Sequence, residues 1–212
     1  MRGLSVVVSL LACWCAGCLS SDAPAAKAWT LDAAPSAPAA GGLEGAGKAA
    51  FTTTRVGAVS VDAPYDKTPF VVRRADGSVA FDHYNVFAAS PAALLRAPVR
   101  NRIGADGRFG SVVSPSSAAW ADAQVEVQVT DLSLDCRTDG RRRARAALAL
   151  DVVKAGRGPR TVALQGAGAG EADAAEGDYA RAFSSAVDAA LAEALKSLKA
   201  PVGEAETERK QP

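Results

Sequence analysis

The sequence predicts an α/β fold in which a mixed β-sheet of about five to six strands packs against two main helices, with an α+β arrangement as the alternative. The first observation is a series of short runs in which apolar and polar residues alternate, separated by Asp-Gly and Gly-Pro turns. The second is composition: of 212 residues 49% are hydrophobic but only 6% aromatic, which allows one domain with a core of modest size. The third is a C-terminal stretch whose apolar residues recur at helical spacing, namely Tyr179, Phe183, Val187, Leu191, Leu195 and Leu198.

The N-terminus has the pattern of a bacterial export signal, because Met1-Arg2-Gly3 precedes a short apolar run. The alternative is a transmembrane helix, but that needs about 20 apolar residues. The stretch Cys15-Ala16-Gly17-Cys18 resembles a lipobox, which predicts cleavage before Cys18 and lipid attachment to it, with Cys13 as the competing site. Leu19 follows Cys18, and by resemblance to proteobacterial sorting rules this residue favours the outer membrane over retention at the inner one. Such cleavage would leave Cys136 as the only free thiol and no internal disulfide.

The chain divides into four segments. Residues 1–17 are the expected signal peptide, and 18–50 form a lipidated Cys with an Ala/Pro/Gly-rich tether. Within that tether the apolar island Ala28-Trp29-Thr30-Leu31 is expected to dock on the domain as a short first strand. Residues 51–200 are expected to form a single α/β domain, and 201–212 a disordered polar tail.

The first half of the domain contains three strand signals and one helix signal. β-Branched residues predict a strand over 51–61, and Asp76-Gly77 predicts the turn of a hairpin that begins near Pro69. Ser90-Pro91 marks a helix start, with Pro98 expected to kink that helix or divide it in two. A short strand over 109–113 follows.

The second half is dominated by one long hairpin. Val125, Val127 and Val129 alternate with polar residues, and after Thr130-Asp131 the parity changes, which predicts a β-bulge. A return strand over 144–152 and a further strand over 161–164 follow. The Gly-Ala run 166–170 is interpreted as a flexible connection to the last helix, which Asp178 is expected to cap.

No residues of the sequence match a catalytic, metal or cofactor motif. There is no Gly-x-Ser-x-Gly elbow, Walker loop or His-Glu-x-x-His, and the 166–170 run lacks the third Gly of a dinucleotide loop because Glu171 stands there. His83 is the only histidine, and we expect it at the surface, without a dyad with Asp82. The protein is therefore expected not to be an enzyme and to use no cofactor.

Five arginines crowd the predicted long hairpin. They form either a solvated turn that protects an edge strand, or a contact for lipid headgroups or an acidic protein surface. Nucleic acid is not an expected partner, since the formal net charge is only +1 and the chain carries an export signal. The five are Arg137, Arg141, Arg142, Arg143 and Arg145.

The order of these features resembles the ABC-type transport auxiliary lipoprotein family, the PqiC-like group. The resemblance rests on the lipobox, on Trp29-Thr30-Leu31, and on the three stretches 59–66 (VSVDAPYD), 70–74 (FVVRR) and 81–88 (FDHYNVFA). It continues with Pro91-Ala92-Ala93-Leu94-Leu95, the hairpin and the last helix. Tyr84-Asn85 departs from the Tyr-His-Arg-Trp type of sequence of proteobacterial members.

The resemblance implies a sheet similar to the N-terminal domain of TolB and no catalytic residues. It implies an accessory of an ABC transporter of the MCE type that moves lipids or other hydrophobic molecules across the cell envelope. Its partners would be an MCE-domain protein and the permease and ATPase of the transporter, with the membrane contacted through N-terminal acylation and the domain facing the periplasm. A homo-oligomer stays open as a further state. The alternative is an envelope-assembly or secretion-apparatus lipoprotein with a TolB-like domain.

Overall fold

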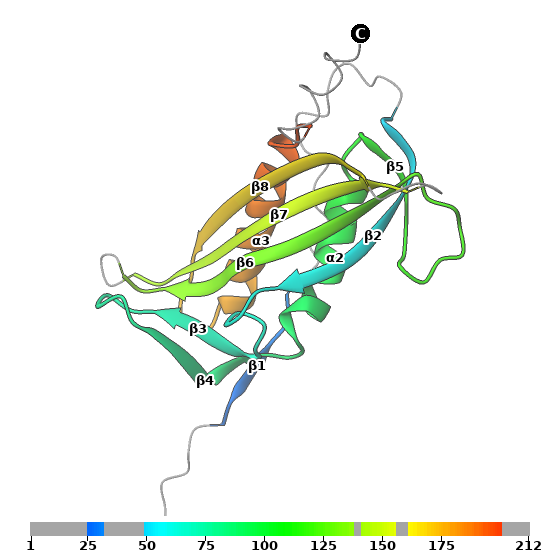
Figure 1. Cartoon of the computed structure of the whole chain (residues 1–212). Coiled ribbons are helices and arrows are strands. Elements are labelled where there is room, and N and C mark those ends of the chain that lie inside the picture. Colours follow the sequence, from blue (N-terminus) through cyan, green and yellow to red (C-terminus); the bar gives the residue numbers. More distant parts are fainter. Residues whose placement is uncertain (1–24, 32–48, 138–140, 156–160, 201–212) are drawn as a thin grey trace, which may run out of the picture.

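A computed structural model describes residues 25–31, 49–137, 141–155 and 161–200 (Figure 1). These residues form one mixed sheet of eight strands with two helices on the same face, so the α/β class is confirmed while the strand count exceeds the expected five to six. The elements are β1 (Lys27–Trp29), β2 (Phe51–Val61), β3 (Pro69–Arg73), β4 (Val79–Phe87), α2 (Pro91–Gly104), β5 (Phe109–Val113), β6 (Ala123–Asp135), β7 (Arg143–Lys154), β8 (Thr161–Asp173) and α3 (Tyr179–Lys196).

Strand β6 is the axis of the sheet. Along one edge it pairs with β7 over its whole length in antiparallel orientation, and β8 continues the sheet beyond β7. Along the other edge its first half pairs in parallel with β2 and its last residues pair in parallel with β3. The sheet therefore divides into two arms on that side, β2–β5 and β3–β4–β1, as Figure 1 shows.

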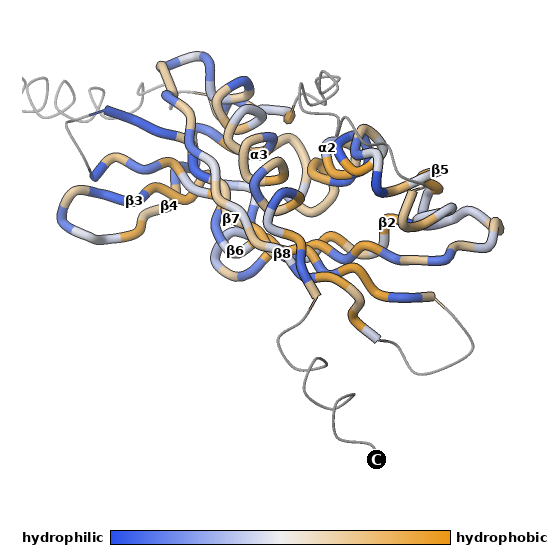
Figure 2. Tube along the Cα trace, turned by 90° about the horizontal axis from the view of Figure 1, so that it is seen from above, coloured by the Kyte–Doolittle hydropathy of each residue, from blue (hydrophilic) through white to orange (hydrophobic). Residues whose placement is uncertain are grey.

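The bulge predicted in the long hairpin is confirmed. The register between β6 and β7 shifts between Val129 and Asp131, where one strand carries an extra residue. Val125, Val127 and Val129 before the shift and Leu132 and Leu134 after it are all buried. The shift thus keeps both halves of β6 facing the helices, which lie together on one side of the sheet in the view from above (Figure 2).

Aromatic side chains fill the core beneath the N-terminal end of α3. The ring of Phe70 lies 4.6 Å from that of Phe87 and 5.0 Å from that of Phe183, measured between centroids. The ring of Tyr179, the first residue of α3, contacts Phe70 and Trp29 edge-on, at 5.7 and 5.5 Å. The expected docking of the N-terminal island is therefore confirmed: β1 pairs in parallel with β4, and Trp29 packs on the core.

The interpretation of residues 166–170 as a flexible connection is wrong. They lie in β8 and pair with β7 over 146–150. Gly166, Gly168 and Gly170 face α3, whose backbone comes so close that a Cβ on any of them would lie within 2.4 Å of a carbonyl oxygen of the helix. The absence of side chains here lets a helix pack directly on a strand.

Both helices begin where the sequence predicts, but without the expected side-chain caps. Ser90 precedes α2 and Asp178 precedes α3, yet neither side chain makes a capping hydrogen bond. Pro98 lies inside a single helix, so the expectation of two short helices is wrong. Neither helix among the described residues is long and apolar enough to cross a bilayer.

Candidate functional site

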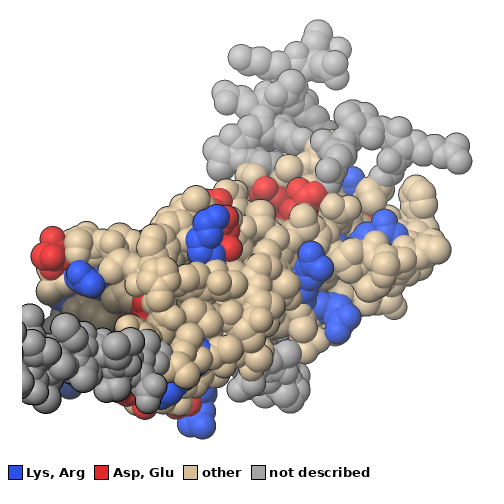
Figure 3. All heavy atoms as spheres, turned by 90° about the horizontal axis from the view of Figure 1, so that it is seen from below, with Lys and Arg blue, Asp and Glu red and all other residues tan. Residues whose placement is uncertain are grey.

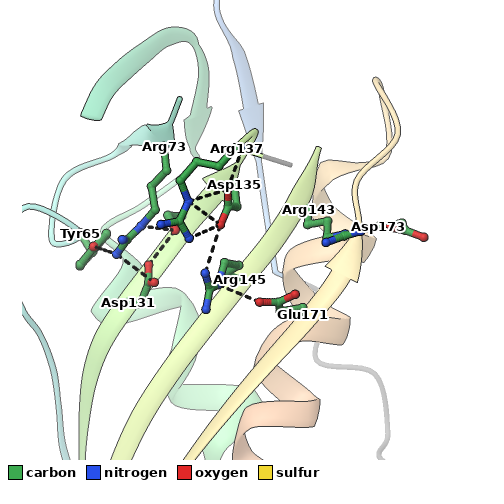
Figure 4. A network of polar contacts seen from close by, with 10 residues as sticks. Tyr65, Arg73, Asp131, Asp135, Arg137, Arg143, Arg145, Glu171 and Asp173 are labelled. Carbon is green, nitrogen blue, oxygen red and sulfur yellow. Dashed lines mark hydrogen bonds and ion pairs between the residues drawn. The ribbon is translucent and has the colours of Figure 1, made fainter. Parts of the chain in front are cut away.

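Polar side chains gather on the outer face of the sheet, at the end where β3, β6 and β7 meet (Figure 4). Asp135, the last residue of β6, accepts hydrogen bonds from both Arg137 and Arg145, with closest N–O distances of 2.6 and 3.1 Å. Arg145 continues to Glu171 on β8 at 3.0 Å. The hydrogen bond from Arg137, helped by Arg145, holds the pKa of Asp135 well below its usual range, so this carboxylate stays ionised.

A second set of contacts extends this network to β3. Arg73 donates to Asp131 at 3.0 Å, to the hydroxyl of Tyr65, and to the hydroxyl of Ser133 at 3.3 Å. Ser133 is fully buried and donates in turn to Asp131 at 2.7 Å. Each charge in this set thus has a partner of opposite charge or a hydroxyl group, and the contacts tie the β3 arm to β6.

The five predicted arginines do not form one patch. Arg143 points to the outer face and approaches Asp173 at 3.7 Å, alongside the pairs that Arg137 and Arg145 make. Arg142 lies on the opposite face, where it donates to the hydroxyl of Tyr179 at 2.5 Å, and Arg141 is exposed. Three of the five charges are therefore balanced by carboxylates within the sheet, and their contact with a lipid headgroup or a partner stays a prediction.

A hollow of about 440 Å³ lies between the β3–β4 hairpin and the end of the sheet where β6 ends and β7 begins. Its floor is apolar, and burial raises the pKa of the Cys136 thiol there, while Arg142 acts in the opposite direction. Arg74, His83 and Arg142 supply nitrogen donors around it. The full lining is Val72, Arg74, Ala80, Phe81, Asp82, His83, Tyr84, Leu134, Cys136 and Arg142.

Strand β4, which borders this hollow with Phe81 and Tyr84, carries exposed apolar side chains that the sequence does not mark as functional. Among the described residues, four large apolar side chains are markedly exposed, and three of them lie on β4: Val79 (51%), Phe81 (44%) and Tyr84 (54%). The signal in the sequence is weak, because Val and Phe in a strand usually indicate a buried face. Here β4 lies beyond the helices, so the same residues face solvent.

Asp82 shapes the strand at this point. Its carboxylate accepts hydrogen bonds from the backbone N–H groups of Tyr84 and Asn85 and from the Asn85 amide, at 2.8 to 3.1 Å. The β3–β4 register shifts at the same place. His83 is exposed, as expected, and the Asp82 carboxylate is bonded to Tyr84 and Asn85.

A second hollow, of about 380 Å³, lies at the other end of the sheet beside Trp120, which is 68% exposed. Arg55 and Lys154 line this hollow, and Arg55 donates hydrogen bonds to the carbonyl oxygens of Ser117 and Ala119 in the adjoining loop. Within the described parts of the chain, no three His, Cys, Asp or Glu side chains come together as a metal site. The predicted lipid attachment residues, Cys18 and Cys13, lie outside the described residues.

The fold is similar to that of a solved bacterial protein. Protein XCC0632 from Xanthomonas campestris, assigned to the family DUF330, aligns with a TM-score of 0.52 over 78% of this chain and 86% of its own, at 15% identity. An uncharacterised protein aligns with a TM-score of 0.48 (15% identity, 69% and 87% coverage), and a PelC dodecamer from Paraburkholderia phytofirmans with 0.37 (13% identity, 86% and 96%). The last two scores are too low to support an argument.

No protein-family model matches the chain, and no curated protein matches its sequence. At 15% identity the likeness to XCC0632 shows a shared fold and nothing finer. The chain thus has the fold of a DUF330 protein.

Proposed function

We propose that this protein is a lipid-anchored accessory protein of the bacterial envelope that faces the periplasm, in an ABC transporter system of the MCE type. In this role it holds a complex together at the membrane while the transporter moves lipids or other hydrophobic molecules. It works by docking and not by catalysis. The outer membrane is the proposed location of the anchor, by way of Cys18.

The observation that carries the proposal is the combination of a lipobox-like stretch with the domain that follows it. Cys15-Ala16-Gly17-Cys18 precedes a domain with the fold of XCC0632, a DUF330 protein. Most of the sequence motifs that resemble auxiliary lipoproteins fall in one region of the sequence, 59–95, which covers the end of β2, β3, β4 and the start of α2. This region includes the exposed apolar side chains of β4, which suit a docking surface.

A docking role also agrees with how the charged groups are used. Arg73, Arg137 and Arg145 hold the sheet together through Asp131 and Asp135. These are structural contacts between strands, and Asp135 is not suited to act as a general base, since the hydrogen bond from Arg137 holds its pKa well below its usual range.

The test is recovery of partners from the native host. Cells that express the full chain with a C-terminal tag are crosslinked and solubilised in mild detergent, and the captured proteins are identified by mass spectrometry. We expect an MCE-domain protein with its ABC permease and ATPase. The matched controls are Cys18→Ala, which should lose both the lipid and the partners, and Cys13→Ala, which should keep them.

Two outcomes would contradict the proposal. Capture of a different envelope machine would favour the alternative, an assembly or secretion lipoprotein. Capture of nothing beyond the Cys18→Ala background would remove the transport role. If instead Cys13→Ala abolishes lipid attachment and Cys18→Ala does not, the anchor is at Cys13. The captured partners alone then decide whether the transport role is correct.

A further inference from the structure

The exposed apolar side chains of β4 lie next to the point where the chain leaves the domain toward its N-terminus. We call Val79, Phe81 and Tyr84 the β4 patch. Strand β1 runs parallel to β4 with Lys27 opposite Asn85, so the chain before Lys27 leaves the sheet on the side of Tyr84 (Figure 1). The β4 patch and the N-terminal exit are therefore at the same end of the molecule.

Chain length limits how far this end can be from a lipid anchor. Eight residues lie between Cys18 and Lys27, so the chain takes nine residue-to-residue steps from one to the other. Even fully extended they span at most about 30 Å, at 3.3 to 3.6 Å per residue. If Cys18 carries lipid, as proposed above, the start of β1 and its neighbour β4 stay within that distance of the membrane surface.

A chain of hydrogen bonds couples β1 to the β4 patch. The indole N–H of Trp29 donates to the Asn85 side-chain oxygen at 3.0 Å, and the Asn85 amide donates to Asp82 at 2.8 Å. Asp82 also accepts the backbone N–H of Tyr84, which fixes the local turn that leaves this ring 54% exposed. The strand nearest the anchor thus sets how the patch is presented.

The charges around the β4 patch suit an anionic surface. Lys27 is exposed beside it, and Arg74 and Arg142 line the adjoining hollow. The two acidic groups nearby are bonded locally: Asp82 as described, and Asp76 by Ser78, whose side chain and backbone N–H both lower its pKa. Figure 3 shows the mixed basic and acidic groups of the face seen from below.

We propose that the β4 patch, with Lys27 and Arg74, is a second membrane contact that lies against anionic phospholipid headgroups. Aromatic side chains with basic neighbours favour the boundary between headgroups and acyl chains. A contact of three side chains is weak by itself, but the lipid anchor raises its effective concentration at the bilayer. The domain would then be held in a fixed orientation, with the β3–β4 hairpin toward the membrane.

Trp120 provides a matched control because it is more exposed than any residue of the patch and lies at the other end of β6. From Ala123 to Asp135 that strand spans about 40 Å at 3.3 Å per residue. A membrane contact at the β4 patch therefore predicts that Trp120 stays in water.

The test uses the full lipidated chain reconstituted in vesicles of phosphatidylethanolamine and phosphatidylglycerol. In a Cys136→Ala background, the single substitutions Phe81→Cys, Tyr84→Cys and Trp120→Cys each receive an environment-sensitive nitrobenzoxadiazole label. Quenching by a nitroxide carried on the lipid is compared with quenching by aqueous iodide. Circular dichroism confirms that each variant is folded, and the mass of the mature chain reports whether it carries lipid.

We expect lipid-borne quenching at positions 81 and 84 to exceed that at position 120 by roughly twofold or more, with the opposite order for iodide. Vesicles of phosphatidylcholine alone, or the added substitution Arg74→Glu, should reduce the difference. If the chain is lipidated and all three labels are equally open to iodide, the second contact is refuted while the anchor stands. If the mature chain carries no lipid at Cys18, the premise fails together with the anchor of the proposed function. The capture of transporter partners reports on the proposed function separately.

Discussion

The close packing of α3 on β8 predicts that adding a single methyl group, at Gly168, lowers the stability of the domain strongly. A Cβ on Gly168 would lie 2.2 Å from the carbonyl oxygen of Ala190 and 2.4 Å from the backbone nitrogen of Ala194. Both are backbone atoms of α3, so neither can rotate away as a side chain could. To restore an ordinary contact, the strand and the helix must separate by about 1 Å.

The cost of Gly168→Ala follows from that separation. A gap of about 1 Å forfeits up to half of the dispersion energy of each atom pair across the interface, and forcing extra volume into a packed core typically costs about 1–3 kcal/mol. Since the obstacle is backbone, we expect the upper part of that range, about 3 kcal/mol. For a domain of this size this corresponds to a decrease in Tm of roughly 6–12 °C.

The assay is urea and thermal unfolding followed by circular dichroism, with Gly107→Ala as the control. Gly107 is exposed, has no positive φ and has nothing within 4 Å of its would-be Cβ, so this substitution should be neutral or slightly stabilising. A Gly168→Ala variant within about 0.5 kcal/mol of the control would refute the close approach of β8 and α3.

Three further predictions concern the ion-pair network, the aromatic core and the thiol. Asp135→Asn should lower the free energy of unfolding by about 2 kcal/mol at neutral pH, since the carboxylate is hydrogen-bonded and nearly buried. Because Arg137 lowers the pKa of Asp135 in the folded state, the extra stability of the wild type is fully present above the unfolded pKa of about 4 and is lost as the pH falls through the folded pKa. Urea unfolding at successive pH values measures this difference in stability, and a difference that does not change with pH would contradict the prediction. Phe183→Ala should cost about 3–5 kcal/mol because its ring is fully buried, whereas the exposed Phe81→Ala should cost less than about 1 kcal/mol, and equal losses in thermal unfolding would argue against the core assignment. Alkylation of Cys136 by iodoacetamide, followed by peptide mass spectrometry, should need a higher pH in the folded chain than in urea, since burial raises the pKa of the thiol; superimposed rate–pH curves would count against this.

Much of the fold could be predicted because the local signals agree with the tertiary structure. The change of parity after Thr130-Asp131 is a local pattern, and the bulge is where it indicates. The residues Tyr179, Phe183, Val187, Leu191 and Leu195 follow one helical stripe, and all five are buried in α3. Trp29 was expected to dock because a large aromatic ring in a polar segment has little other reason to be there, and it does dock.

The prediction that the glycine run 166–170 is a flexible connection was wrong for a physical reason. By propensity, alternating Gly and Ala argue against a strand, since Gly orders at a high entropic cost. Only the approach of α3 explains Gly166, Gly168 and Gly170, because the helix backbone occupies the space where side chains would be. These contacts join residues 16 to 28 positions apart in the chain and leave no local signal of their own.

The candidate site was predicted in composition but not in arrangement. The arginine-rich hairpin is visible in the sequence, but strand alternation places Arg142 on the face opposite Arg143. Glu171, the carboxylate partner of Arg145 on β8, can be identified only from the β7–β8 register. That register could not be predicted, because the glycine run was not recognised as part of a strand.

The length of the elements explains why this fold leaves one end open. Strand β6 has 13 residues and spans about 40 Å, while α3 has 18 residues and spans about 26 Å. With α2 packed on β2 and β5 at one end, α3 covers β7 and β8 and begins at Tyr179, where Arg142 meets it. The inner face beyond that point keeps its apolar residues but has no helix above it, so Val72, Leu134 and Cys136 line a hollow there. The β3–β4 register places Val79 and Phe81 of the β4 patch opposite Arg73 and Val71, on the outer face of the same arm. Exposed apolar side chains on β4, at the end nearest the proposed lipid anchor, are the reason to look there first for contact with the membrane.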